Sequence, residues 1–392
     1  MYKLSEVCDL IKGTTGIQKC KPGNYPLVVT AEERLTSEEY QFDCDAVCIP
    51  LVSSTGHGHA SMKRVHYQSG KFALGNILCA VIPKDSEKLL AEYLYVYFSI
   101  FKDDVLVPLM KGAANVSLTV NSLKEVEVPI PDINRQKEII NKYTKIVNSL
   151  TEISKKNMKI IEYTEKLKEK ILSIAICGEL TNNLDAISNV EQQEEKPFKI
   201  PNNWVWKKLS EISTINGGYA FKSGELKNEG VRVIRISDFD TEGFVDKKIV
   251  RIKYDSSFDP FKICENNILI AMTGGTVGKS LLVPEIDEDM YNNQRVANIK
   301  VDDTENVKYI HYVLKSKLIQ DVVNANKKSS NDNISMEDIK NFNIPLPTRM
   351  EQDIIVEKME ALDFKITKIF ELMEDNNIAV NNILKSFLQN CI

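Results

Sequence analysis

The chain of 392 residues lacks any run of about 18 consecutive apolar residues, and its N-terminal segment lacks the apolar core of a signal peptide. These absences predict a cytoplasmic protein without membrane contact. The eight cysteines have no disulfide-framework spacing, so we expect reduced thiols. A net charge of −5 argues against non-specific binding of a polyanion, but it allows local basic and amide groups to read a nucleic acid.

What the chain does contain is an internal duplication. Three motifs occur once in each half: Lys3–Glu6 and Lys208–Glu211, Asn115–Ser117 and Asn333–Ser335, and Pro129–Pro131 and Pro345–Pro347. The copies are separated by 205, 218 and 216 residues, which is far too long for a solenoid repeat. Because the chain is also long enough for two domains with their own cores, we expect two similar domains.

Each copy begins with a head that mixes strands with a helix. We name residues 1–131 the first head and residues 201–347 the second head. Short apolar runs between Gly, Pro, Asn and Asp predict strands at Ala46–Ile49, Asn76–Ile82, Val231–Ile236 and Asn267–Ala271. Helix-like stretches follow at Leu89–Phe101 and Val307–Val323. We therefore expect two β-rich mixed domains of the α+β class.

A long helix is expected after each head, at residues 132–180 and 348–392. Apolar residues recur there at alternating spacings of four and three, the heptad seam of a coiled coil. One helix cannot bury such a seam alone, so we expect the two helices to pair antiparallel, and their net charges of +3 and −3 favour this. The residues expected at the seam are Ile146, Leu150, Ile153 and Asn157 in one helix and Ile366, Ile369, Met373 and Asn376 in the other.

Two polar residues interrupt this seam, Asn157 and Asn376. If they face each other, they fix the register of the helix pair at a cost in stability. The alternative is that each lies at a poorly packed point or faces a partner, and the sequence leaves both open. Between the first helix and the second head, residues 181–200 are polar, acidic and aperiodic, which predicts a linker.

One segment of the second head is similar to a phosphate-binding loop. Thr273–Ser280 follows a strand-like run and ends in Gly-Lys-Ser. That loop requires glycine where Thr273 stands and must open a helix, whereas Leu281–Val283 reads as a strand and Pro284 follows. Nucleotide hydrolysis is therefore not expected.

The first head offers a better interpretation of this segment. Asp45–His57 aligns with Asn267–Lys279, so both heads place a loop rich in Gly, Ser and Thr, with one basic residue, directly after a strand. Small residues allow backbone N–H groups to approach a ligand closely, and hydroxyl groups bind phosphate oxygens or base edges. A tight hairpin loop that binds nothing is the alternative.

Loops rich in basic and amide side chains recur in both heads. Such side chains read base edges through paired hydrogen bonds to guanine or adenine. A solvated charged surface would have the same composition, so the recurrence in both heads carries the prediction. The candidate DNA-binding residues are Lys19, Lys21, Ser53, Ser54, His57, His59, Lys63, Arg64, Lys111 and Asn115 in the first head and Lys222, Thr273, Thr276, Lys279, Asn293, Gln294, Arg295, Lys327 and Lys328 in the second.

No catalytic residues and no metal site are expected. The set nearest to a zinc site consists of Cys44, Cys48, His57, His59 and His66. Its His-x-His pair is not a usual pair of zinc ligands, and the second head has no equivalents. A DNA adenine methyltransferase should carry an Asn/Asp-Pro-Pro-aromatic motif, and Asp259–Phe261 lacks one of its prolines. No convincing nuclease cluster is present either.

Head, Pro-x-Pro, Gln, long helix and linker follow one another, and most of this order then repeats. The segments that carry the pattern are Pro129–Gln136, Pro345–Gln352, the helix end Leu167–Leu180 and the restart Ile200–Leu209. In this order and spacing the chain resembles, over essentially its whole length, the DNA-specificity subunit of type I restriction–modification enzymes. It departs from the family pattern at Arg135, where Glu is usual, and at Asn390–Ile392, which lack the Gly-Glu-Leu of the first helix end.

This resemblance implies a sequence-specific DNA-recognition subunit without catalysis of its own. Each head would be a target-recognition domain that reads one half of a bipartite double-stranded DNA target. The paired helices would set the spacing between the halves and dock two methylation subunits that hold S-adenosylmethionine, and a translocase–nuclease restriction subunit could join them. No cofactor is expected in this chain. The alternatives are the specificity subunit of a methylation-only system, a catalytic DNA methyltransferase, and a coiled-coil scaffold without DNA contact.

Overall fold

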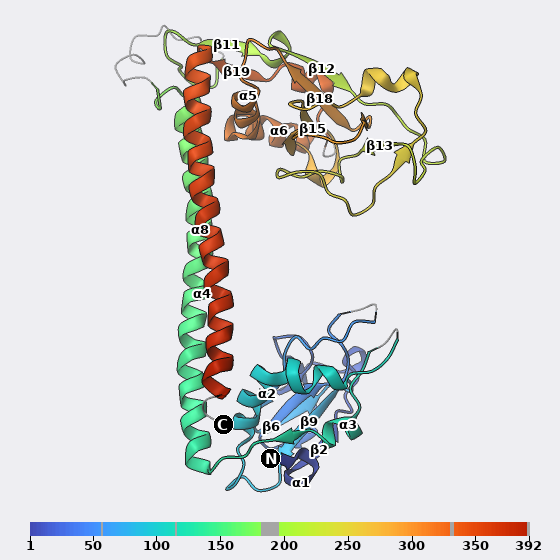
Figure 1. Ribbon diagram of the computed structural model, residues 1–392, viewed down its shortest axis with the longest axis vertical. Coiled ribbons are helices and arrows are strands. Elements are labelled where there is room, and N and C mark those ends of the chain that lie inside the picture. Colours follow the sequence, from blue (N-terminus) through green and yellow to red (C-terminus); the bar gives the residue numbers. More distant parts are fainter. Residues whose placement is uncertain (56–57, 114–115, 182–195, 330–332, 390–392) are drawn as a thin grey trace. The chain divides into compact units, whose positions relative to one another are not determined.

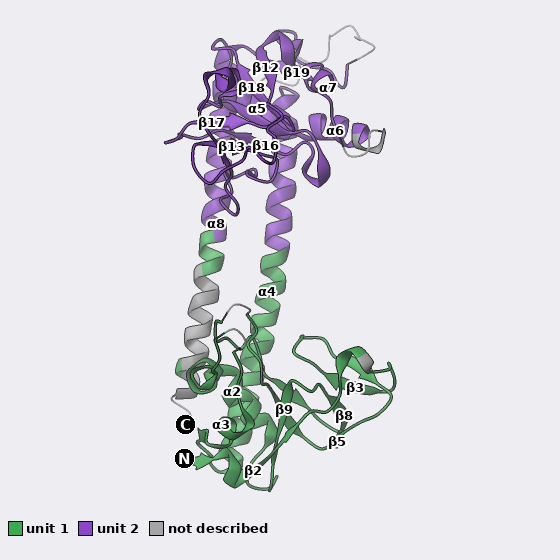
Figure 2. Cartoon of the chain, turned by 90° about the vertical axis from the view of Figure 1, so that its right-hand side faces the viewer, with its two compact units in different colours: residues 1–158, 371–392 green, residues 159–370 purple. Residues whose placement is uncertain are grey.

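The computed structural model describes residues 1–55, 58–113, 116–181, 196–329 and 333–389. The chain falls into two compact units, Met1–Met158 with Glu371–Ile392, and Lys159–Phe370 (Figure 2). Each unit contains one head together with parts of both long helices, and Figure 1 labels the elements along the chain. The middle of the expected linker, residues 182–195, lies outside the described residues.

The first head contains two four-stranded sheets. The first sheet is antiparallel with the order β2-β9-β6-β7, which are Cys8–Lys12, Leu78–Pro83, Ala46–Pro50 and His66–Gln68. In the second sheet β3 and β8 are parallel, and the order β4-β3-β8-β5 corresponds to Leu35–Ser37, Tyr25–Val28, Lys71–Leu74 and Phe42–Asp43. Strands β6 and β9 confirm the two strands that the apolar runs predict in this head.

Alternating side chains of the first sheet build the core of this head. Val47 of β6 packs in one cluster with Tyr93 of helix α2 (Ala91–Val105), which covers one face of the sheet (Figure 1). The next residue, Cys48, packs in another cluster with Phe72 of the second sheet. Because successive side chains of a strand point to opposite faces, one apolar run serves both layers. The head therefore has three layers, a helix and two sheets.

The second head repeats this architecture. Its antiparallel sheet has the order β12-β18-β15-β16, which are Ser213–Gly217, Val296–Val301, Ile268–Ala271 and Ser280–Leu282. A three-stranded sheet has the order β14-β13-β17, which are Arg251–Ile252, Val231–Ile234 and Met290–Asn292, with β13 and β17 parallel. Ile270 clusters with Tyr309 of the covering helix, and Leu269 clusters with Ile234 of the smaller sheet. The strand order confirms the duplication.

One helix expected in the second head is two helices. The sequence predicts a helix over Val307–Val323, but the structure has α5 (Val307–Lys315) and α6 (Lys317–Ser329). The buried hydroxyl of Ser316 donates to the carbonyl of Val313 at 2.5 Å, and the backbone of Ser316 is extended, with ψ at 158°. Because a serine hydroxyl offers the backbone an alternative hydrogen bond, the helix ends and restarts there.

The same pair of short strands closes each head: β1 (Tyr2–Lys3) with β10 (Glu127–Val128), and β11 (Val205–Lys208) with β19 (Asn343–Leu346). A capped helical turn follows the first strand of each pair, because the Lys3 N–H donates to the Glu6 carboxylate at 3.0 Å and the Lys208 N–H to the Glu211 carboxylate at 2.7 Å. The remaining short elements are α1 (Leu4–Val7), η1 (Ile17–Lys19), η2 (Val107–Leu109), α3 (Val120–Lys124), η4 (Leu209–Glu211), η5 (Ser256–Phe261), η6 (Gly274–Thr276) and α7 (Met336–Lys340).

The two long helices are α4 (Ile133–Ile176) and α8 (Arg349–Gln389), close to the expected 132–180 and 348–392. Within the described ranges of the chain, no helix combines the length and the apolar character needed to cross a membrane. Each long helix starts two positions after the second proline of a Pro-x-Pro motif, so the junction of head and helix recurs in both units.

A buried glutamine fixes this junction in the first head. Gln136 is 0% exposed, and its side-chain carbonyl accepts a hydrogen bond from the N–H of Leu90, the residue before α2, at 2.9 Å. Its amide donates to the carbonyl oxygens of Lys88 and Pro131, each at 2.8 Å. One side chain thereby ties the first turn of α4 to the start of α2, which explains the Pro-x-Pro and Gln spacing.

The second head has the same junction. Gln352 is 0% exposed, accepts from the N–H of Asn306 just before α5 at 2.8 Å, and donates to the Pro347 carbonyl at 3.1 Å. Tyr93 and Tyr309 also match, because each hydroxyl donates to the carbonyl of the first proline of its Pro-x-Pro motif. The repeated motif is therefore structural.

Within the second unit, α4 and α8 run antiparallel. Lys168 of α4 forms an ion pair with Asp363 of α8 at 2.5 Å, and the Lys358 ammonium donates to the Leu180 carbonyl just after α4 at 3.0 Å. Residue numbers therefore rise along one helix as they fall along the other. The apolar residues packed around this contact are Leu172, Ala175 and Ile176 with Ile355, Val356 and Met359.

The expected seam residues are less buried than residues near the helix ends. Ile153 and Ile369 are exposed at 43% and 37%, whereas Ile139 and Ile355, which pack against the heads, are 0% exposed. The side chain of Asn376 lies outside the described part of the structure, so its pairing with Asn157 stays a prediction. The seam residues that are half-buried are Ile146, Leu150, Asn157, Ile366 and Met373.

Candidate nucleic-acid interface

Three segments of the second head meet at one edge of its four-stranded sheet. The loop after β15 begins at Met272, whose N–H donates to the carbonyl of Arg295 in the β17–β18 turn at 2.9 Å. The Met272 carbonyl accepts from the N–H of Ile334 at 2.9 Å, and Thr273 pairs with Asn333 in an antiparallel bridge. The structure thus brings the repeated Asn-Ile-Ser motif beside two of the loops expected to contact DNA.

The β17–β18 turn presents exposed hydrogen-bond donors at this edge. Gln294 and Arg295 are exposed, whereas Asn293 is half-buried and its side-chain oxygen accepts from the Arg295 N–H at 3.4 Å. Thr276 of the neighbouring loop is exposed as well. Amide and guanidinium groups are the ones that read adenine and guanine edges in a duplex.

An aromatic cluster adjoins this turn and was missed by the sequence reasoning. The Gln294 N–H donates to the Tyr219 carbonyl at 3.0 Å, and the Tyr219 ring, 39% exposed, lies 5.0 Å from Phe221 and 4.9 Å from Phe258 between centroids. Lys222 next to this cluster is exposed. Aromatic spacing around residues 219–221 and 258–261 was the available signal. An exposed ring can stack on a nucleobase, so Tyr219 joins the candidates.

Lys279, the lysine of the Gly-Lys-Ser segment, points into the protein. Its ammonium donates to the carbonyl oxygens of Ile236, at 3.0 Å, and Phe239, and it lies 4.8 Å from the centroid of the Phe239 ring. Burial lowers the pKa of Lys279. The preceding Gly278 has φ of 83°, and a Cβ there would lie 2.7 Å from Val323 of α6. These contacts favour a structural role for Lys279 over contact with DNA.

The corresponding edge of the first head is built from a longer loop, residues 51–65 between β6 and β7. The Leu51 N–H donates to the Ile77 carbonyl at 2.8 Å, and the Ser53 N–H donates to the Val116 carbonyl at 3.0 Å. The Leu51 carbonyl accepts from the Leu118 N–H at 2.9 Å. The two bonds of Leu51 match those of Met272 in the second head, so the β8–β9 turn takes the place of the β17–β18 turn.

Hydroxyl groups of this loop bond to the loop itself. The Ser53 hydroxyl donates to the His59 carbonyl at 2.6 Å, and the Ser54 hydroxyl accepts from the Lys63 N–H at 2.8 Å. The side chains of His59 and Lys63 are exposed. The two serines therefore hold the loop in shape, and His59 and Lys63 remain as the groups presented outward.

The other expected residues of the first head are spread over several segments. Lys111 is exposed, and its backbone exchanges two 2.9 Å hydrogen bonds with Ser117. Arg64 forms an ion pair with Glu32 at 3.0 Å. Lys21 lines a cleft of about 380 Å³ beside the β2–β3 connection. Lys111 thus joins the edge formed by the long loop.

Five expected residues cannot be assigned contacts. His57 and Asn115 lie outside the described residues, and for Lys19, Lys327 and Lys328 only the backbone is described. Lys327 and Lys328 belong to α6, which packs on the loop after β15 through Val323. The role of these five residues in DNA binding stays a prediction.

His66 of the zinc-like set is held by a cation. Its Nδ1 lies 3.0 Å from a guanidinium nitrogen of Arg34, and burial together with the charges of Arg34 and Arg64 lowers the pKa of His66 to about 4. Its ring is therefore neutral at pH 7. Among the described residues no group of three or more His, Cys, Asp or Glu could hold a metal ion, and the seven described cysteines are free thiols.

The fold defines a protein with two copies of one domain. The junction between head and long helix is the same in both copies, whereas the loops at the sheet edge differ. The family model of the type I restriction modification DNA specificity domain matches residues 1–163 and again 201–377. The chain therefore belongs to the family of type I restriction–modification DNA specificity proteins. This confirms the resemblance seen in the sequence.

Curated relatives have the same description. The EcoBI specificity subunit of Escherichia coli is 26% identical over 282 residues, which are 69% of this chain and 58% of that protein. The EcoDI specificity subunit of Escherichia coli is 22% identical over an alignment that covers 99% of this chain and 87% of that protein. The chain spans 58% of the EcoBI subunit and 30% of the EcoAI subunit.

Two solved structures share the fold at low sequence identity. A chain from a type I restriction–modification system, described in terms of complex assembly and conformational transition, aligns over 100% of this chain and 96% of its own with a TM-score of 0.63 and 12% identity. The HsdS subunit of Thermoanaerobacter tengcongensis aligns over 100% and 95% with a TM-score of 0.52 and 13% identity.

Proposed function

We propose that the chain is the non-catalytic DNA-recognition subunit of a type I restriction–modification complex, in which each head reads one half of a bipartite target. One observation carries this proposal: in both heads the loop after the third strand of the sheet order, the neighbouring turn and a third segment, Ser117–Leu118 or Asn333–Ile334, meet at the same sheet edge, yet the exposed groups differ. A shared framework with unlike edges suits two unlike half-sites. Membership in the DNA specificity family supports the same conclusion.

The exposed donors at the two edges match the chemistry of base and phosphate contacts. The second head offers Gln294, Arg295 and Thr276, and the first head offers His59, Lys63 and Lys111. Arginine and glutamine pair with guanine and adenine, while lysine suits the phosphate backbone. The net charge of −5 is compatible with this, since a few local cations are sufficient when partner subunits surround the DNA.

The long helices have a surface suited to partners. Large apolar side chains are exposed on both, with Met158 at 72% and Tyr163 at 64% on α4 and Phe364 at 65% and Leu372 at 62% on α8. Large apolar side chains that stay exposed on a helix are candidates for contact with a partner. We assign them to the docking of two methylation subunits, which would hold S-adenosylmethionine and methylate adenine, and a translocase–nuclease subunit could join the complex.

Replacing one exposed donor tests the DNA-recognition proposal. In the chain assembled with its methylation subunits, Arg295→Ala should weaken binding to the cognate duplex by roughly 5- to 150-fold, because a bidentate arginine–guanine contact is worth about 1–3 kcal/mol. The matched control is Lys300→Ala, which removes an exposed cation about 16 Å away along β18. The dissociation constants are measured by fluorescence anisotropy with labelled duplex.

Sequencing of methylated adenines in cells that express each variant supplies the second readout. Arg295→Ala should relax the target at one position of one half-site and leave the other half-site unchanged. Equal losses for both variants would contradict recognition through the β17–β18 turn. Methyl transfer or ATP turnover by the purified chain alone would overturn the non-catalytic assignment.

Co-purification tests the docking of methylation subunits on the helices. Tyr163→Glu and Phe364→Glu place a charge on the exposed apolar surface and should sharply reduce the methylation subunit recovered with the chain. Glu165→Gln, on an exposed position of the same helix, is the control. Full recovery with both charged variants would exclude this surface as the docking site.

A further inference from the structure

One exposed tyrosine of the second head is bonded directly to the turn that presents Gln294 and Arg295. The Tyr219 N–H donates to the Asn292 carbonyl at 2.9 Å, and the Tyr219 carbonyl accepts from the Gln294 N–H at 3.0 Å. Tyr219 and Asn293 thereby form a parallel bridge. Because the backbone of Tyr219 is fixed to the turn, its side chain lies beside any base that the turn contacts.

Packing holds the Tyr219 ring in place and leaves part of it open. Its centroid lies 5.0 Å from that of Phe221 and 4.9 Å from that of Phe258, and Phe261 is a third neighbour at 5.4 Å. Phe221 and Phe258 pack in turn against Tyr291, which is 1% exposed. Tyr219 itself is 39% exposed. The second head therefore presents an apolar ring whose position is set before any ligand binds.

The first head carries a threonine at the equivalent place. The Thr15 N–H donates to the Leu74 carbonyl at 3.1 Å, and the Thr15 carbonyl accepts from the Asn76 N–H at 3.0 Å. Thr15 also forms a parallel bridge with Gly75, so all three backbone contacts match those of Tyr219. One framework position thus holds an aromatic ring in one head and a small hydroxyl side chain in the other, as expected where two unlike half-sites are read.

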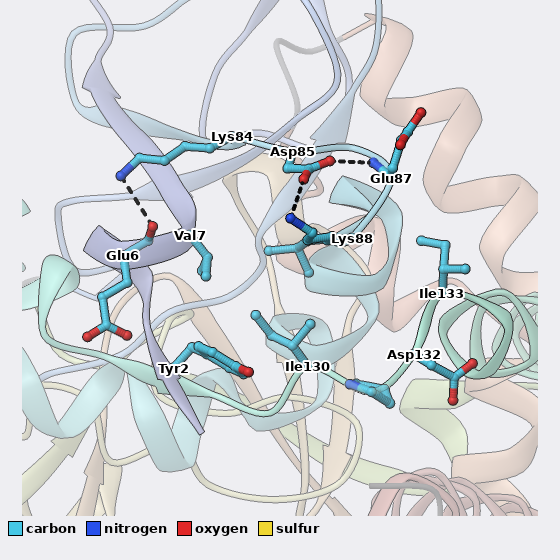
Figure 3. Close-up of a pocket in the computed structure, with 12 residues that line it drawn as sticks. Tyr2, Glu6, Val7, Lys84, Asp85, Glu87, Lys88, Ile130, Asp132 and Ile133 are labelled. Carbon is cyan, nitrogen blue, oxygen red and sulfur yellow. Dashed lines mark hydrogen bonds and ion pairs between the residues drawn. The ribbon is translucent and has the colours of Figure 1, made fainter.

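Other exposed tyrosines have different surroundings. Tyr2, 50% exposed, lines a pocket of about 500 Å³ in the first head together with Ile130 (Figure 3). Tyr40, 44% exposed, packs on Tyr25 with the ring centroids 4.9 Å apart. Exposure and aromatic packing are therefore common to several tyrosines, and the feature that points to DNA is the bonding of Tyr219 to the β17–β18 turn.

We infer that the Tyr219 ring contacts the 5-methyl group of a thymine in the half-site read by the second head, next to the base pair contacted by Gln294. Among the groups that distinguish base pairs in the major groove, the thymine methyl is the apolar one. Stacking on a base face would require the base to leave the helix, whereas contact with a methyl group leaves the duplex intact. The inference rests on the proposed function, because that function supplies the duplex.

Deoxyuridine lacks only this methyl group and therefore tests the contact. The half-site is the one in which Arg295→Ala relaxes the sequence, and each of its thymines is replaced in turn. Fluorescence anisotropy of the chain assembled with its methylation subunits should show one replacement that raises the dissociation constant about fourfold, equivalent to about 0.8 kcal/mol for one buried apolar carbon. In Tyr219→Ser the same replacement should change the dissociation constant by less than about 1.5-fold.

The ratio of dissociation constants for thymine and deoxyuridine separates a lost contact from a weakened fold, because a general loss of binding affects both duplexes equally. Tyr219→Phe keeps the ring and should keep the preference for thymine. Tyr40→Ser removes a tyrosine of similar exposure and similar aromatic packing from the first head, and should leave the preference unchanged.

The outcomes distinguish this inference from the function on which it rests. A half-site without thymine, or an equal effect of deoxyuridine on Tyr219→Ser and on the unmodified chain, would overturn the methyl contact and leave the proposed function intact. Failure of the unmodified assembly to prefer its cognate duplex over an unrelated one would overturn the proposed function itself.

Discussion

The two heads share a framework and differ at the edge where their loops meet. The strand connection at this edge spans residues 51–65 in the first head and only 272–279 in the second. The neighbouring turn presents Ile77 in the first head and Arg295 in the second. In both heads the carbonyl of this residue accepts a hydrogen bond from the first residue of the loop, Leu51 or Met272. The framework is set by buried apolar layers, whereas the edge is free to vary because its side chains face outward.

The heads also differ where they meet their helices. Glu351 of α8 accepts hydrogen bonds from Trp204 at 3.2 Å and from Asn203 at 3.1 Å, so the segment before β11 is tied to that helix. Arg135 stands at the equivalent position of α4 and pairs with Glu138 at 2.6 Å. The residue that departs from the family pattern, Arg135, thus forms an ion pair within its own helix.

The largest expected effect comes from breaking the shared junction. Gln136→Ala and Gln352→Ala each leave buried backbone groups without partners and open a cavity, so each should destabilise its own head by about 4 kcal/mol. Both tryptophans of the chain lie in the second head, so their fluorescence in urea follows Gln352→Ala. Hydrogen exchange of β6 follows Gln136→Ala. A decrease in the free energy of unfolding below about 1 kcal/mol in either head would contradict the equivalence of the two glutamine junctions.

A pair of glycine variants compares the loops of the two heads. Gly278→Ala should cost about 3 kcal/mol, from the positive φ of 83° and the 2.7 Å approach to Val323. Gly70→Ala should cost only about 1 kcal/mol, because its φ of 69° is strained but nothing lies within 4 Å. Urea unfolding of each head gives both values. Equal costs would show that α6 does not constrain the loop after β15.

Acidic pH should weaken both heads through buried histidines. The native pKa of about 4 for His66 lies below its unfolded value of about 6.5, so the unfolded state binds more protons between these values. Stability is full above pH 6.5 and falls by about 2 kcal/mol by pH 5. Burial also lowers the pKa of His311 to about 3, which predicts the same sign in the second head.

Hydrogen exchange of β7 at pH 7.5 and pH 5 measures the effect of His66, and tryptophan fluorescence measures the effect of His311. The variant His66→Gln retains an acceptor for Arg34 but cannot titrate, so its first head should lose this pH dependence. An unchanged pH slope in the variant would assign the effect to other groups.

The smallest expected effect distinguishes a structural role of Lys279 from a role in DNA recognition. Lys279→Met should cost about 1 kcal/mol by leaving the Ile236 and Phe239 carbonyl oxygens without their donor. Its effect on DNA affinity should stay within about twofold, in contrast to Arg295→Ala. A loss of DNA affinity as large as that of Arg295→Ala would restore Lys279 as a contact residue.

Periodicity and repetition made the framework predictable. The apolar runs at β6 and β15 identify buried strands, and the heptad spacing identifies α4 and α8, because burial imposes those periods on a sequence. The break at Ser316 was not predictable, since the apolar pattern continues across it while one buried hydroxyl turns the chain. The role of Gln136 was hidden for a similar reason, because two of its three hydrogen bonds join residues far apart in sequence.

Candidate contact residues were only partly predictable. The exposed Arg295, Gln294 and Lys63 remain candidates because composition identifies groups that can read DNA. Lys279 lies in a loop of the same composition, but its side chain points inward and bonds to the Ile236 carbonyl. No local sequence pattern shows this.

The glutamine junction also governs how the molecule opens. Because Gln136 bonds both the residue before α2 and Pro131, two positions before α4, neither helix can fray at that end without releasing the other. Head and first helical turn should therefore exchange their amide protons as one cooperative foldon. The middle of α4, where Ile153 is 43% exposed, belongs to no such foldon and should open first.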